Sequence, residues 1–136
     1  MTDPLTPERR SENMRRIRAK GTEPEIVVRR LVYSMGFRYR LHVANLPGKP
    51  DLVFRRRKKI IDVRGCFWHC HPGCIDSHMP KSRLDYWRPK LRRNQQRDHE
   101  NARALRSAGF RVLIVWECEI RNEARLEGKL RRFLNR

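Results

Sequence analysis

The spacing of apolar residues predicts a helix in the segment that follows Thr22. Thr22 and Glu25 fit a capping-box pattern, in which a hydroxyl and a carboxylate satisfy the first free N–H groups of a helix. Val27, Leu31 and Met35 then recur at intervals of four, which places them in one stripe along a helix. We therefore predict a helix that turns this stripe toward the core and ends at the next glycine.

Four later segments have the apolar patterns of β-strands. Residues 37–43 alternate between apolar and polar side chains, which is typical of a half-buried strand. Residues 51–54 and 60–63 are short, mostly apolar runs, and the basic run 55–59 between them predicts a hairpin turn. Residues 110–116 are almost all apolar, which predicts a central strand covered on both faces.

Three further helices complete the predicted order α-α-β-β-β-α-β-α. A basic helix is predicted over residues 6–19, and Pro89, a residue that suits a helix start, predicts a long helix that ends at Gly109. The last helix has its apolar residues on one side, at Leu126, Leu130, Phe133 and Leu134. This order predicts an α/β fold, a single domain over residues 1–136 with a mixed β-sheet flanked by helices.

The net charge of the chain indicates which class of partner it binds. The 136 residues include 33 Lys and Arg against 15 Asp and Glu, which gives a formal net charge of +18. Basic residues occur along the whole length, so nucleic acid is a better match than a membrane surface or a merely solubilising charge. No apolar run approaches the ~18 residues of a membrane span, and the first residues, MTDPLTPERR, lack the apolar core of a signal peptide. We expect a cytoplasmic, DNA-associated protein without a membrane partner.

The segment GCFWHCHPGC, residues 65–74, contains three of the four cysteines. In a reducing compartment cysteines are more often metal ligands than disulfides, and structural zinc needs four nitrogen or sulfur ligands. The chain offers six candidates, which are Cys66, His69, Cys70, His71, Cys74 and Cys118. The alternative interpretation is that the cysteines are unliganded members of the core.

Acidic residues at neighbouring strand ends suggest a second metal site. Asp51 begins one predicted strand, and Asp62 and Arg64 end the next. Carboxylates brought together there can hold Mg²⁺, and a basic residue beside them can stabilise negative charge on a phosphate. The alternative for Asp51 is an ordinary turn acid after Pro50. Asp98 lies on the apolar stripe of its predicted helix, where a carboxylate needs a partner.

Four large apolar residues are of the type that some DNA-binding proteins insert between base pairs. Phe67 and Trp68 are adjacent in the cysteine-rich segment, Trp87 follows it, and Met14 lies in the N-terminal basic helix. In a basic protein, such side chains can insert between the base steps of DNA. The alternative is that they pack in the core against the cysteine-rich loop.

Taken together, these motifs resemble the very-short-patch repair (Vsr) mismatch endonucleases. The similarity extends from about Ser11 to Cys118 and is carried by LPGKPD, GCFWH, PKS followed by YW, RN followed by RD, and RVLIVWEC. The resemblance implies a restriction-endonuclease-like PD-(D/E)xK core over residues 22–136, preceded by a DNA-contacting helix within residues 1–20. Arg64 departs from the family, which has His or an acid there, and Arg is a poor proton shuttle because it stays protonated.

The resemblance also implies roles for individual residues of a catalytic site. Asp51 matches the aspartate that binds the catalytic metal, and Val63 matches the position whose main-chain carbonyl holds the same ion. His69 matches the catalytic histidine, which draws a proton from the attacking water. Glu25 and Asp98 match acids of the same site.

Two further groups of residues follow from the resemblance. The structural zinc ligands are expected at Cys66, His71, Cys74 and Cys118, with Cys70 as an alternative ligand. The DNA-contacting residues are expected at Met14, Arg15, Phe67, Trp68 and Trp87.

The function implied is that of a Mg²⁺-dependent DNA endonuclease that nicks one strand at a T:G mismatch, with Zn²⁺ as a structural ion. Its expected partners are double-stranded DNA with that mismatch and other mismatch-repair proteins, and a monomer suffices to nick one strand. Two alternatives are a zinc-stabilised DNA-binding module without catalysis and a restriction-type or structure-specific nuclease. The pair Asp51 and His69 favours an enzyme over the binding module.

Overall fold

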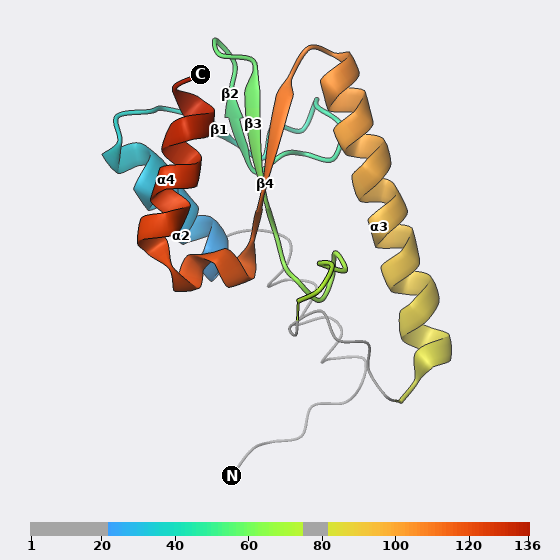
Figure 1. The fold of residues 1–136 in the computed structure, drawn as a ribbon. Coiled ribbons are helices and arrows are strands. Elements are labelled where there is room, and N and C mark those ends of the chain that lie inside the picture. The colour runs from blue at the N-terminus through green and yellow to red at the C-terminus, as the bar shows by residue number, and fades with distance from the viewer. Residues whose placement is uncertain (1–21, 75–81) are drawn as a thin grey trace.

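The computed structural model describes residues 22–74 and 82–136, which hold three α-helices, one 3-10 helix and a four-stranded sheet (Figure 1). The helix predicted over residues 6–19, with Met14 and Arg15, lies outside these residues. In the described part of the chain, no helix is both long enough and apolar enough to cross a membrane.

The sheet is mixed, as predicted, and its strands follow the order β1-β2-β3-β4. The strands are β1 (Arg40–Leu41), β2 (Leu52–Phe54), β3 (Lys59–Arg64) and β4 (Arg111–Trp116). The pairs β1–β2 and β2–β3 are antiparallel, and β3 runs parallel to β4 with Val63 opposite Val115. The start of β2 and the end of β3 therefore lie at the same end of the sheet.

Helices cover both faces of this sheet (Figure 1). Helices α2 (Glu23–Ser34) and α4 (Glu123–Leu134), with the 3-10 helix η2 (Glu117–Arg121), lie on one face, and α3 (Leu84–Ser107) lies on the other. The larger core cluster is on the first face, where Val28 and Val32 of α2 are fully buried. A smaller cluster under α3 contains Leu105. At roughly 1.5–3 kcal/mol for each large apolar side chain, this burial is the main force that joins the layers.

Lys59 fastens the end of α4 to the sheet. Its side chain is 3% exposed, and its ammonium donates to the carbonyls of Phe133, Leu134 and Arg136 at 2.7, 3.2 and 2.8 Å. Carbonyls in the last turn of a helix lack donors within the helix, so the buried ammonium supplies them. Burial, reinforced by nearby arginines, lowers the pKa of Lys59.

The prediction that residues 110–116 form a central strand is wrong for the sheet of the described residues. There β4 is the edge strand and β3 lies between β2 and β4. The apolar sequence of β4 reflects cover on both faces, because Val112 packs in the cluster under α3 and Val115 in the larger cluster. An all-apolar strand thus reports two covered faces and says nothing about its place in the sheet.

Two other predicted boundaries are corrected. Helix α3 begins at Leu84 and contains Pro89 within it. A proline this near the start leaves only the Asp85 carbonyl without a donor, and Asp85 is exposed, so water can satisfy it. The strand predicted over residues 37–43 is reduced to Arg40–Leu41, because His42 has a φ of 45° and leaves the extended conformation.

The predicted stripe of α2 is broader than expected. Val27 is buried, and Leu31 and Met35 pack against the core as predicted. The fully buried positions, however, are Val28 and Val32, so the stripe is centred one residue further along the chain.

Candidate active site and cysteine cluster

A cleft of about 620 Å³ opens at the end of the sheet where β2 begins and β3 ends. Its lining includes most of the polar residues that the sequence indicated, which are Asp51, Asp62, Arg64, His69 and Asp98. Val63, the position expected to offer its main-chain carbonyl, also lines the cleft. The lining also includes His42, Asn94 and Arg97, for which no role was predicted from the sequence. The parallel and antiparallel pairing of β3 with its neighbours is what brings these distant segments to one cleft.

Asp51 is held rigidly by the two strands. Its Oδ2 accepts the main-chain N–H of Val63 at 2.7 Å, and its own N–H donates to Oδ1 of Asp62 at 3.2 Å. Burial and the nearby charge of Asp62 raise the pKa of Asp51 to about 8, against the lowering effect of the Val63 N–H. Glu25 adds to the increase. A carboxylate in this position is poorly stabilised unless a positive charge joins it.

Asp62 faces the cleft rather than the core side of its strand. Burial raises the pKa of Asp62, while the N–H of Asp51 and the positive charge of Arg64 act to lower it. Asp51 and Asp62 therefore form a close acidic pair that crosses the β2–β3 boundary. Arg64, two residues beyond Asp62, brings positive charge to the same cleft.

Glu25 belongs to this site as well as to the start of α2. Its N–H donates to the Thr22 hydroxyl at 3.4 Å, so half of the predicted capping box is present. Its carboxylate, however, is buried, forms an ion pair with Arg29, and lies 3.1 Å from Nε2 of His42. One oxygen or nitrogen each from Glu25, His42 and Asp51 lies within 4.8 Å of the others.

His69 and Asp98 form the second polar pair of the cleft. Nδ1 of His69 lies 2.5 Å from Oδ2 of Asp98, and both side chains are 18% exposed. Asp98 thus has the partner that its position on an apolar stripe demanded. Nearby on α3, buried Asn94 donates to the carbonyl of Trp68 at 3.4 Å and ties the loop that carries His69 to the helix.

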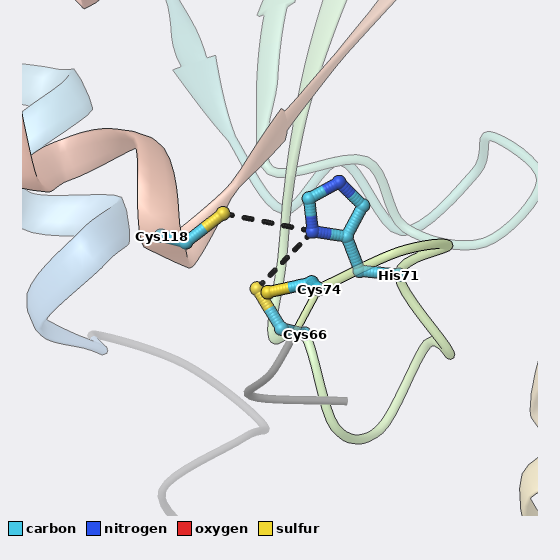
Figure 2. Close-up of side chains that lie close together, drawn as sticks. All are labelled: Cys66, His71, Cys74 and Cys118. Carbon is cyan, nitrogen blue, oxygen red and sulfur yellow. Dashed lines mark hydrogen bonds between the residues drawn. The ribbon is translucent and has the colours of Figure 1, made fainter. Parts of the chain in front are cut away.

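Four potential ligands converge below the sheet in a cysteine cluster, which we define as Cys66, His71, Cys74 and Cys118 (Figure 2). One ligand atom from each lies within 4.8 Å of the others. The first three come from the loop after β3, and the last comes from the start of η2. Cys70 is not part of the cluster, and its thiol lies 4.0 Å from the carbonyl of Leu91.

The geometry of the cysteine cluster fits a tetrahedral metal. Nδ1 of His71 is 3.6 Å from Sγ of Cys66 and 3.6 Å from Sγ of Cys118. Zinc bonds of ~2.3 Å to sulfur and ~2.0–2.1 Å to nitrogen give a tetrahedral edge of about 3.5–3.6 Å. Burial raises the pKa of the Cys66 thiol to about 12 and also raises that of Cys118, so the thiolates need a cation to form.

Residues at the end of β4 and the start of η2 contact members of the cysteine cluster. The ring of His71 stacks on Trp116, with centroids 4.1 Å apart and planes at 10°. The main-chain N–H of Cys66 donates to Oε1 of Glu117 at 2.8 Å.

Phe67, Trp68 and Trp87 form an aromatic cluster between the cysteine-rich loop and the start of α3. Each ring contacts the other two edge to face, with centroids 5.2–5.7 Å apart. The ammonium of Lys90 lies 5.4 Å from the ring centre of Trp68. None of the three belongs to either core cluster, and all are partly exposed.

Comparison with known proteins identifies the family. A family model described as DNA mismatch endonuclease Vsr matches residues 2–74. Over 99% of this chain and 98% of the relative, the sequence is 50% identical to the type II nicking enzyme V.XorIIP of Xanthomonas oryzae pv. oryzae. It is 38% identical to the DNA mismatch endonuclease Vsr of Escherichia coli K12, over 86% of this chain and 74% of the relative. The chain belongs to the Vsr DNA mismatch endonuclease family.

The resemblance inferred from the sequence motifs is thereby confirmed. A second nicking enzyme, V.NmeAIP of Neisseria meningitidis serogroup A, is 41% identical over 98% of this chain and 95% of its own length. As a Vsr-family protein, the chain is a DNA endonuclease, a hydrolase of phosphodiester bonds. The family assignment favours the enzyme over a DNA-binding module without catalysis.

Several residues of the site in this Vsr-family chain have no role that was predicted from the sequence. His42 follows a short exposed strand, and no spacing relates it to Glu25 or Asp51. Asn94 lies between Leu91 and Asp98 on the stripe of α3, so its place on that stripe was an available signal. Glu117 precedes the ligand Cys118 and offered no signal of its own.

Proposed function

We propose that this chain is a Mg²⁺-dependent endonuclease that nicks one DNA strand at a T:G mismatch during very-short-patch repair. The observation that carries the proposal is the cleft in which the acids around Asp51 and the His69–Asp98 pair share one lining. The names of the relatives, which are nicking enzymes and a mismatch endonuclease, agree with it. The adjacent acids at the ends of β2 and β3 support a PD-(D/E)xK-like core.

Asp51 and the main-chain carbonyl of Val63 would hold the magnesium ion, and Asp62 is a further possible ligand. The fit rests on the acid pair, since the raised pKa of Asp51 reports a carboxylate that lacks a positive partner. The Val63 N–H fixes one oxygen of Asp51 at 2.7 Å and so orients the carboxylate. Bound Mg²⁺ supplies charge stabilisation to the phosphoryl oxygens and to the attacking oxygen.

His69 would act as the general base. An ionised Asp98 can only accept a hydrogen bond, so it keeps the proton on Nδ1 of His69 and leaves a lone pair on Nε2. Nε2 takes the proton of the attacking water as the water oxygen bonds to phosphorus. The leaving 3′ or 5′ oxygen departs from phosphorus with the electron pair of the broken bond. Asp98 then stabilises the imidazolium.

Arg64 would contribute fixed positive charge to the cleft. Its position at the end of β3, in the lining of the cleft, allows it to contact a phosphate oxygen. Because a guanidinium stays protonated at all relevant pH values, Arg64 stabilises charge and does not transfer protons. Glu25 lies beside this site, and its charge helps to raise the pKa of Asp51.

The cysteine cluster would hold a structural zinc ion. Its three thiols and one imidazole are a typical zinc donor set, and the 3.6 Å separations from His71 agree with tetrahedral coordination. Such an ion joins the loop after β3 to the start of η2. The same loop carries Phe67, Trp68 and His69, so the zinc site would position both the aromatic residues and the base.

The aromatic cluster would enter the DNA beside the mismatch. Phe67, Trp68 and Trp87 lie together outside both cores, and the proposed N-terminal helix would add Met14 and Arg15. A mismatched pair costs less to unstack than a matched pair, so insertion of these side chains selects the mismatch. We further propose that the chain acts as a single nuclease domain and a monomer in the cytoplasm, alongside other mismatch-repair proteins.

The cation site is tested by the substitution Asp51→Asn. We expect loss of nicking with unchanged binding to the mismatched duplex, because the amide keeps the shape of the side chain but is a weak Mg²⁺ ligand. The measurement is nicking of a labelled duplex together with a binding titration. The matched control is Asp85→Asn, an exposed acid at the start of α3, which should nick normally. Nicking by Asp51→Asn at the wild-type rate would place the cation elsewhere.

A further inference from the structure

His42 lies between Asp51, which lines the cleft, and Glu25, a buried acid beside it. Glu25 comes from the first turn of α2, and Asp51 comes from the residue before β2. His42 directly follows β1, and its main-chain N–H donates to the carbonyl of Asp51 at 3.2 Å. This bond continues the β1–β2 pairing by one step and holds the backbone of His42 beside Asp51.

The backbone of His42 is bent in a way that aims the ring at the acids. Its φ of 45° lies in the left-handed region, which costs about 1 kcal/mol for a residue with a side chain. With this bend, Nε2 lies 3.1 Å from both oxygens of the Glu25 carboxylate and 3.7 Å from Oδ1 of Asp51. Strain at a residue of a functional cleft is commonly retained because the resulting geometry is used.

The side chains of Glu25, His42 and Asp51 together offer three donor atoms, which would form one face of an octahedral coordination sphere. One ligand atom from each lies within 4.8 Å of the others, and His42 and Asp51 both line the cleft. Neighbouring ligands of an octahedral ion with bonds of ~2.0–2.1 Å are about 2.8–3.0 Å apart. The 3.1 Å separation of His42 from Glu25 is close to that value, and the 3.7 Å separation of His42 from Asp51 is longer.

We propose that His42 is a protein ligand of the catalytic cation, through Nε2, and that Glu25 joins Asp51 and the Val63 carbonyl in its donor set. This inference rests on the proposed cation site at Asp51 and extends it. Mn²⁺ tolerates an imidazole ligand better than Mg²⁺ does, because Mg²⁺ is the harder ion and strongly prefers oxygen. The site therefore accepts Mn²⁺ as well as Mg²⁺, with nitrogen in its coordination sphere.

The competing role for His42 is structural. In that case the imidazole only donates a hydrogen bond to Glu25 and holds α2 against the sheet. Glutamine can donate a similar bond from its amide, so His42→Gln keeps the structural role and removes the imidazole ligand. Comparing these two roles therefore needs a measurement of metal coordination, not of activity.

Mn²⁺ is the probe, added to zinc-containing protein without DNA. Electron spin echo spectroscopy should detect ¹⁴N coupling to Mn²⁺ bound to the wild-type chain. In His42→Gln the coupling should vanish, and Mn²⁺ should bind about tenfold or more weakly. In His69→Gln and in the exposed control His99→Gln, both the coupling and the affinity should persist. Persistence in these two variants tests the assignment even if His42→Gln fails to fold.

Three results would overturn the inference in different ways. Bound Mn²⁺ without ¹⁴N coupling in the wild-type chain removes His42 as a ligand but leaves the cation site at Asp51 intact. Coupling that survives in His42→Gln and disappears in His69→Gln assigns the nitrogen to the base instead. Mn²⁺ affinity that is unchanged in Asp51→Asn removes the proposed cation site itself, and this proposal with it.

Discussion

At the scale of single residues, Asp51 is mostly buried, although its charged form is more stable in water. Burial and the neighbouring acids raise its pKa to about 8, although the Val63 N–H partly compensates. A group in such surroundings destabilises the protein when it is charged and alone, and it gains the most from a bound cation. The position of Asp51 therefore costs folding stability, and binding of the proposed cation would offset that cost.

This exchange predicts a pH-dependent effect of Asp51→Asn on thermal stability. Because the folded pKa of Asp51 is raised above its unfolded value of about 4, its contribution is favourable at low pH and is lost as pH rises through about 8. Without added Mg²⁺, the melting temperature of the variant relative to wild type should therefore increase from pH 6 to pH 9. Calorimetry of both proteins measures this difference. A constant difference, or the same trend in Asp85→Asn, would contradict it.

A second prediction concerns the orientation of His69. In Asp98→Asn the amide can donate to Nδ1, which favours the tautomer with the proton on Nε2 and blocks proton acceptance from water. We expect kcat for nicking to fall about 10²-fold or more, within the range of lost general-base catalysis, with DNA affinity unchanged. Steady-state kinetics with a binding titration measures both. Glu100→Gln, an exposed acid on the same helix, is the control; an equal decrease there would point to a general effect on α3.

Residue types explain how much of the site could be predicted from the sequence. The sequence indicated Asp98, because its carboxylate lies on the apolar stripe of a helix and therefore needs a partner. In the structure that partner is His69. Glu25 gave a misleading signal, because a capping-box acid and a buried site acid have the same spacing from Thr22. His42 gave none, since its contacts depend on a left-handed backbone and on pairing between β1 and β2.

At the scale of elements, the loop after β3 has little regular structure and depends on its attachments. It is joined to η2 through the cysteine cluster and to α3 through Asn94 and the aromatic cluster. This loop carries His69 and two of the proposed DNA-contacting aromatics, Phe67 and Trp68, while Trp87 lies on α3. The proposed zinc ion is therefore needed for the site, even though it lies outside the cleft.

The zinc assignment predicts different effects for two cysteine substitutions. Cys118→Ser should lose the zinc and lower the melting temperature, because it removes the ligand that joins η2 to the loop. Cys70→Ser should keep about one zinc per chain, because Cys70 lies outside the cysteine cluster. Elemental analysis of the purified proteins gives the stoichiometry. Zinc loss in Cys70→Ser with retention in Cys118→Ser would contradict the ligand set.

Element boundaries show what local patterns can and cannot determine. The apolar pattern of β4 correctly indicated two covered faces, yet strand order is set by which neighbours pair, and no local pattern records that. Pro89 was a poor marker of the helix start, because a proline in the second turn costs little when the freed carbonyl is exposed. The two-residue β1 is short because the conformation of His42 ends it.

At the scale of the whole molecule, a strongly basic chain gathers several acids in one cleft. The chain carries a formal charge of +18, while Asp51, Asp62 and Asp98 gather in one cleft. The basic surface attracts DNA without regard to sequence and makes binding steeply dependent on salt. The acids of the cleft would repel a phosphate, and the proposed cation, together with Arg64 in the same lining, would offset that repulsion. In the proposed function, affinity for DNA therefore comes mainly from the basic surface, and catalysis comes from the cleft.

The central claim is that cleavage needs both a mismatch and a divalent cation. The most direct test is single-turnover nicking of two labelled duplexes that differ only in a T:G or a T:A pair, with Mg²⁺ added or omitted. Omission is preferable to a chelator, which would also remove zinc from the cysteine cluster. We predict a nick in one strand of the T:G duplex only with Mg²⁺, about tenfold or more faster than any cut in the T:A duplex, since ~1.4 kcal/mol of saved unstacking gives that factor. Equal cutting of both duplexes, or cutting of the T:G duplex without Mg²⁺, would contradict the account.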